Sequence, residues 1–98
     1  MLQFGTKITW QSQAAGVWEK KEGMVVSFLP KKEEFNDIIV REKWHKLPVK
    51  KTIKSPTLDW FLNKLKTVPK VSAQDRYLVW VPSRNRFYTP FKAVAERG

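Results

Sequence analysis

The distribution of β-type residues most limits what this chain can fold into, because they gather in short runs at its two ends. In the first third, alternation of apolar and polar residues predicts strands over 6–11, 17–21 and 24–29. We place a loop over 12–16 and a hairpin turn at Glu22 and Gly23, since Gly16 and Gly23 tolerate positive φ. Pro30 ends the third strand, because proline cannot donate to a strand ladder.

The last third returns to the same pattern and predicts a second hairpin. Its strands cover 76–81 and 86–89, and residues 82–85 form the turn between them. A turn or 3₁₀ step over 90–94 should then lead into a final short strand, as occurs where small barrels close. Alternation leaves open which face of the strand over 76–81 is the inner one. It is either the face of Tyr77, Val79 and Val81 or the face of Leu78 and Trp80.

The segment from residue 31 to residue 54 is polar and charged and supports two interpretations. Its apolar residues fit a helix over about 32–44, but Ile38, Ile39 and Val40 equally fit a short strand, because β-branched residues suit a pleated surface. Residues 46–54 follow as a basic connector, in which Pro48 opposes continuation of a helix. We expect this connector to be extended and exposed.

A helix from Ser55 to about Thr67 is the clearest element of the middle of the chain. Ser55 can accept the first amide hydrogens, and Pro56 at the first helical position loses no hydrogen bond. One apolar face, expected to pack on the sheet, is formed by Leu58, Phe61, Leu62 and Leu65. Pro69 marks the end of the helix.

Composition limits the chain to one domain. Its 98 residues, of which 42% are hydrophobic, suffice for a single modest core, so residues 1–98 are expected to fold together. Without cysteine the fold must rest on packing, and disulfides, thiolate metal ligands and thiol nucleophiles are excluded. The N-terminus lacks the features of a signal peptide, and no stretch approaches the length of a membrane helix, about 18 apolar residues. We therefore expect a cytoplasmic protein.

Charge points to an anionic partner. The 19 Lys and Arg residues outnumber the 9 Asp and Glu residues, which gives a formal net charge of +10. Such an excess attracts polyanions, nucleic acid above all, although lysines kept for solubility would give the same balance.

An enzyme is poorly supported by the residue inventory. His45 is the only histidine, and the chain has neither a glycine-rich phosphate loop nor paired catalytic carboxylates. The acidic run of Glu33, Glu34 and Asp37 is mixed with lysines and is more typical of a solvated face than of a metal site. We therefore expect no catalytic residue, no metal and no cofactor.

Cations and aromatic rings interleave in the C-terminal hairpin. This composition suits nucleic acid, since cations neutralise phosphates and flat rings stack on bases, but it also fits rings that are simply core. Further lysines lie in the connector and around the first hairpin, the latter including Lys31 and Lys32. The candidate nucleic-acid-binding residues are Lys20, Lys21, Lys50, Lys51, Lys54, Arg76, Arg84, Arg86, Tyr88 and Lys92. Among these, Arg86 and Tyr88 share the charged parity of their strand and are the best candidates for exposure.

Both ends of the chain also carry a family resemblance, in residues 8–16, 19–26 with Pro30, 77–82 and 87–90. These stretches resemble a largely uncharacterised family of small proteins of bacteria and their phages, with an SH3-like barrel related to the KOW-type modules of nucleic-acid-associated proteins. The resemblance implies a mainly β (α+β) fold in which hairpins within 6–30 and 76–96 form the barrel. Residues 31–73 would then be a helical, basic insertion.

Two functions follow as expectations. The first is a non-catalytic accessory domain that binds DNA or RNA, contacting phosphates through Lys and Arg and bases through exposed aromatic rings. The second is a protein-interaction module, such as a phage-encoded inhibitor or a subunit of a larger ribonucleoprotein, because Trp, Tyr and Arg also dominate protein interfaces.

Overall fold

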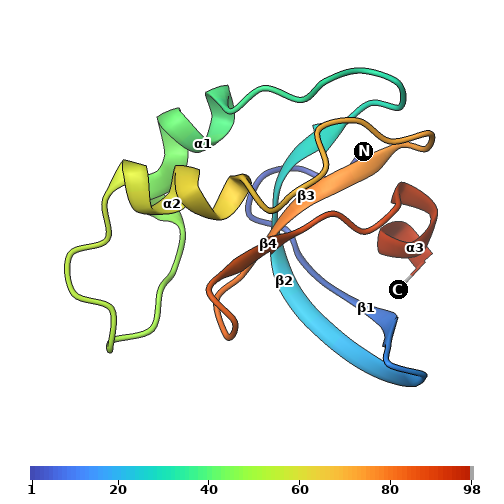
Figure 1. Ribbon diagram of the computed structural model, residues 1–98, viewed down its shortest axis with the longest axis horizontal. Coiled ribbons are helices and arrows are strands. Elements are labelled where there is room, and N and C mark those ends of the chain that lie inside the picture. Colours follow the sequence, from blue (N-terminus) through green and yellow to red (C-terminus); the bar gives the residue numbers. More distant parts are fainter. Residues whose placement is uncertain (98) are drawn as a thin grey trace.

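The computed structural model describes residues 1–97, the side chains of Ala14 and Arg97 excepted, and contains a four-stranded antiparallel sheet (Figure 1). The strands lie in the order of the sequence: β1 (Lys7–Ala14), β2 (Val17–Leu29), β3 (Arg76–Val81) and β4 (Arg86–Tyr88). The helices are α1 (Ile38–Lys43), α2 (Leu58–Leu65) and α3 (Lys92–Arg97), with a 3₁₀ turn at Trp44–Lys46. The expected mainly β, α+β class is confirmed.

The first hairpin differs from the predicted one, because β2 is a single strand of 13 residues. Its turn lies at Ala15 and Gly16, which both have positive φ, and the turn predicted at Glu22 and Gly23 is wrong. Gly23 lies inside β2 without positive φ, at a point where the next strand comes very close. Its role is close strand approach, which also calls for glycine.

The sheet is strongly bent but not closed. Strand β2 pairs with β1 over 17–24 and with β3 over 24–29, and its register shifts between Val25 and Ser27. Extra residues of this kind bend a strand and increase its twist. Within residues 1–97 the strands β1 and β4 form the two edges and do not pair with each other, so the backbone closure of a barrel is absent.

Both faces of the sheet are covered, and every residue of β3 is buried. One hydrophobic cluster lies against α1 and α2 and includes Val26, Val40, Phe61, Leu65, Leu78, Trp80 and Phe87. The other lies against α3 and includes Ile8, Trp10, Val25, Tyr77, Val79, Val81 and Ala95. Neither parity of β3 is therefore the outer one, which explains why alternation alone did not identify an inner face.

The predicted helix of the middle segment is confirmed as α2, with a later start. Thr57, rather than Ser55, caps it, since its hydroxyl accepts a hydrogen bond from the Trp60 amide at 3.2 Å. Ser55 instead has a φ of 48°, just after the connector and before the cap. As expected, the apolar face of α2 packs on the sheet through Phe61 and Leu65.

Two other segments are resolved by the structure. Residues 38–43 form the short helix α1, so the alternative of a strand over Ile38 to Val40 is wrong, and the helix begins later than residue 32. The final short strand expected near the C-terminus is also wrong, because residues 92–97 form α3. This helix packs on β1 and β3, where Ala95 joins the second hydrophobic cluster.

Tyr77 ties the two ends of the chain together from the centre of the sheet. Its side chain is buried, its hydroxyl donates to Glu96 Oε1 at 2.6 Å, and the same oxygen accepts from the Leu2 amide at 2.9 Å. Burial raises the pKa of the Tyr77 phenol, so it stays a donor. The donated hydrogen bond in turn holds the pKa of Glu96 below its ordinary value of 4.5.

We expect the Tyr77→Phe variant to lose stability at neutral pH, and to lose less in acid. Because the pKa of Glu96 is lowered on folding, this carboxylate stabilises the fold above its unfolded pKa, and the contribution disappears as the pH falls through the folded pKa. Urea unfolding of both proteins at neutral pH and at about pH 3 tests this. In a Glu96→Gln background the same Tyr77→Phe change should have an effect that does not vary over this pH range; an unchanged pH dependence would contradict the assignment.

Candidate nucleic-acid interface

The bend of the sheet brings its two edge strands toward each other through side chains. The Trp10 ring of β1 meets the Tyr88 ring of β4 edge to face, with centroids 6.3 Å apart. Nearby, Arg84 in the β3–β4 turn reaches Glu19 of β2, with Nη2 and Oε1 3.1 Å apart. The open side of the sheet is thus bridged by rings and charges instead of backbone hydrogen bonds.

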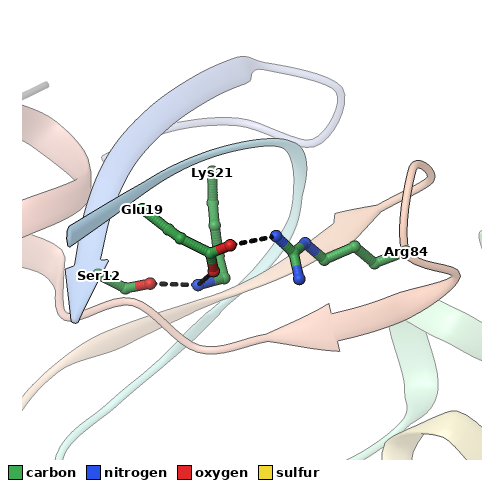
Figure 2. Close-up of polar contacts among 4 residues, drawn as sticks. All are labelled: Ser12, Glu19, Lys21 and Arg84. Carbon is green, nitrogen blue, oxygen red and sulfur yellow. Dashed lines mark hydrogen bonds and ion pairs between the residues drawn. The ribbon is translucent and has the colours of Figure 1, made fainter. Parts of the chain in front are cut away.

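A polar group occupies this bridge (Figure 2). The Lys21 ammonium donates to Ser12 Oγ and lies 3.5 Å from Glu19 Oε2, while Arg84 binds the other oxygen of the same carboxylate. Ser12 and Glu19 are directly opposite each other in the β1–β2 register, so the hairpin alone sets their spacing. One carboxylate therefore serves two cations.

Tyr88 extends the polar group along β4. Its half-buried ring has the Lys21 ammonium 5.3 Å from its centroid and the Arg86 guanidinium 5.6 Å from it, both within cation–π range. Arg86 is exposed, as the parity of its strand predicted. We call the six residues that line this bridge the seam cluster: Ser12, Glu19, Lys21, Arg84, Arg86 and Tyr88.

Charge in the seam cluster is unbalanced, with three cations for one carboxylate. The hydrogen bond and charge of Arg84 hold the pKa of Glu19 below its ordinary value, and the same contact raises the pKa of Arg84. Glu19 is therefore ionised at neutral pH and competes with any external anion for Arg84. Because both groups are largely solvated, their pair adds little stability and exchanges readily.

Two predicted surface cations are buried instead. Arg76 is only 2% exposed, and its Nη1 donates to the Pro69 carbonyl at 2.9 Å, so it fastens the segment after α2 and is not placed to contact phosphate. Burial lowers the pKa of its guanidinium. Lys21 is 7% exposed and is used within the seam cluster. Both sit on strand parities that the sequence alone did not identify as internal.

The remaining predicted residues do not form one surface. Lys50, Lys51 and Lys54 are exposed in the connector, at the end of the molecule away from the β1–β2 hairpin (Figure 1). Lys92 begins α3, and its Nζ lies 3.5 Å from Glu96 Oε2. Lys20 is exposed but lies on the opposite face of the hairpin from Lys21.

Because the turn at Glu22 and Gly23 was predicted incorrectly, two lysines were also expected in the wrong place. Lys31 and Lys32, expected beside Lys20 and Lys21, follow the far end of the 13-residue strand. The structure therefore joins only the C-terminal hairpin with the β1–β2 hairpin, and it does so at the seam cluster.

Sequence reasoning missed Ser12, Glu19 and Trp18. Ser12 and Glu19 enter the site through the register of β1 and β2, which was not known from the sequence. Trp18 is 65% exposed near the tip of the same hairpin. The signal for Trp18 was present, since it shares its parity with Lys20 and Glu22 and stands apart from the apolar positions.

Among the described residues, no group of three or more His, Asp or Glu side chains is arranged to hold a metal ion. No helix in the same part of the chain is long and apolar enough to cross a membrane. No protein family, curated protein or solved structure matches the chain in comparison searches.

Proposed function

We propose that the chain is a non-catalytic nucleic-acid-binding domain and that the seam cluster contacts the phosphate backbone. The observation that carries this proposal is the grouping of Lys21, Arg84 and Arg86 around a single carboxylate and the Tyr88 ring. Exposed guanidinium groups form strong, charge-assisted hydrogen bonds to phosphate. The net charge of +10 supplies the long-range attraction.

The form that we propose for this domain is a variant of the SH3-like barrel of the KOW type. The strongly bent sheet and the contact of Trp10 with Tyr88 across its open side support this assignment. In this description, side chains of the seam cluster substitute for the missing strand pairing, and the segment carrying α1 and α2 is an insertion between β2 and β3. The seam is then a polar line from which Arg84 and Arg86 reach solvent.

Charge variants of the seam cluster test the proposal in opposite directions. Glu19→Gln frees Arg84 and should tighten binding of a labelled oligonucleotide several-fold at low salt. The slope of log affinity against log salt concentration should become steeper by about one released counterion. Arg86→Gln should weaken binding about fivefold to tenfold, roughly 1 kcal/mol. Fluorescence anisotropy titrations at several salt concentrations give both quantities.

Glu42→Gln is the matched control for Glu19→Gln, because it makes the same charge change on α1, away from the hairpin (Figure 1). It should raise affinity less than Glu19→Gln does. Equal effects of the two variants would mean that only net charge matters and would remove the seam cluster from the site. Absence of oligonucleotide binding at low salt would contradict the function itself.

The second candidate function is a protein-interaction module, and one feature favours it. A cleft of about 480 Å³ between α1 and α2 is lined by apolar residues that include Phe35, Leu62, Leu65 and Val68, and also by the cations Arg41 and Lys66. Such a cleft suits an apolar side chain of a partner protein. Binding of this kind would be far less sensitive to salt than binding to nucleic acid.

A further inference from the structure

Trp18 is an exposed aromatic residue whose position the fold does not explain. Its exposed fraction is 65%, whereas Trp10 on the same hairpin is 6% exposed and Trp80 is fully buried. Trp18 belongs to neither hydrophobic cluster and makes no ring contact with the described part of the chain. Tryptophan usually buries about 150–250 Å² of surface, but the Trp18 ring is exposed to solvent.

The surroundings of Trp18 are polar and cationic. In the β1–β2 register Trp18 lies opposite Gln13, and Lys20 lies opposite Gln11, so these four side chains share the outer face of the hairpin. All four are exposed. Trp18 and Lys20 are two residues apart along one strand, about 7 Å, so the ammonium lies within reach of a phosphate attached to a base that contacts the ring.

We infer that the outer face of the β1–β2 hairpin binds single-stranded nucleic acid, with one unpaired base stacked on the Trp18 indole and Lys20 on its phosphate. This inference rests on the proposed function and names the class of nucleic acid. An aromatic face can stack only on a base whose own face is free, which is the normal state of a single strand and not of a duplex. The amides of Gln11 and Gln13 add donors and acceptors for base edges.

The seam cluster does not supply this stacking surface itself. The Tyr88 ring already has Lys21 and Arg86 within 6 Å and meets Trp10 at its side. Its role is to hold cations. Among the aromatic residues of the described chain, Trp18 at 65% is more exposed than Phe91 beside α3 at 41%. The outer face of the hairpin thus supplies the stacking ring with Lys20 beside it, and the seam cluster adds cations on the other face.

The test compares single-stranded oligothymidine with a hairpin duplex of equal charge, each labelled and titrated by anisotropy at fixed low salt. The chain should bind the single strand more tightly. Trp18→Ala should weaken single-strand binding roughly tenfold or more while leaving the slope of affinity against salt unchanged, because no charge is removed. Trp18→Phe should keep most of the affinity, and Lys20→Gln should instead lower the salt slope by about 0.7.

The outcomes separate this inference from the proposed function. The inference would be overturned if the duplex bound as tightly as the single strand or more tightly. It would also be overturned if folded Trp18→Ala bound the single strand as tightly as the parent does. In either case the proposed function would stand as long as Glu19→Gln and Arg86→Gln had their expected effects. Absence of binding to either oligonucleotide would overturn both. The inference would be supported if Trp18→Ala lost affinity for the single strand but not for the duplex. An unchanged urea midpoint would show that the variant is folded.

Discussion

Replacing Gly23 by alanine should lower the free energy of unfolding by about 1–3 kcal/mol, although Gly23 lies in a strand where alanine is normally acceptable. A Cβ at this position would lie 2.5 Å from Val79 Cγ1 and 2.8 Å from the Trp80 carbonyl oxygen. The oxygen belongs to the central strand and cannot turn aside, so β2 and β3 must separate. The gain of about 0.4–1 kcal/mol from a stiffer unfolded chain offsets only part of this cost.

Urea unfolding and thermal melting both measure the effect. For a domain of this size the loss corresponds to a melting temperature lower by roughly 5–15 °C. Glu22→Ala is the matched control, because this neighbour is exposed and its change should stay within about 0.5 kcal/mol. A Gly23→Ala variant as stable as the parent would show that β2 and β3 do not approach as closely as the structure has them.

Gly23 also shows why the first hairpin was predicted incorrectly. In the sequence, Glu22 and Gly23 interrupt an apolar pattern in the way that a turn does. The same glycine is required where two strands come together, and only the position of β3 distinguishes the two cases. That position depends on residues more than 50 places further along the chain, which local pattern does not contain.

Elements set by local chemistry were predicted well. The C-terminal hairpin depends on adjacent residues, so the bounds of β3 were predicted correctly and those of β4 to within one residue. Helix α2 depends on the spacing of its own apolar face, so its existence was predicted correctly, although Thr57 and not Ser55 caps it. The C-terminal segment differed because α3 is short and is held by tertiary contacts, among them the packing of Ala95 on the sheet and the hydrogen bond from Tyr77 to Glu96.

The candidate site was also predicted correctly only where it depends on local sequence. Arg84 and Arg86 lie in a local hairpin and are exposed as expected, whereas Arg76 and Lys21 carry charges on faces that tertiary contacts bury. Charge is therefore a poor guide to exposure in a strand that is covered on both sides. The seam cluster as a whole required the bend of β2, which places Glu19 beside Arg84 across 65 residues of sequence.

Replacing Trp80 by alanine should be the most damaging single change, with a loss of about 3–5 kcal/mol. Its ring is fully buried, with centroids 4.8 Å from Phe87, 5.1 Å from Phe61 and 5.9 Å from Trp60. The indole Nε1 also donates to the Pro48 carbonyl at 2.7 Å, which fastens the connector to the sheet. Since a domain of this length is stable by only about 5–15 kcal/mol, much of the population should unfold at moderate temperature.

Trp18→Ala is the control for Trp80→Ala, because it is the same substitution on an exposed ring and should change stability by no more than about 0.5 kcal/mol. Trp80→Phe should fall between them, since it keeps a ring in the cluster but loses the donor to Pro48. Circular dichroism during urea titration ranks the three variants. A Trp80→Ala protein as stable as Trp18→Ala would contradict the packing of α2 on the sheet, because Trp80 is the residue on which Phe61, Trp60 and the connector converge.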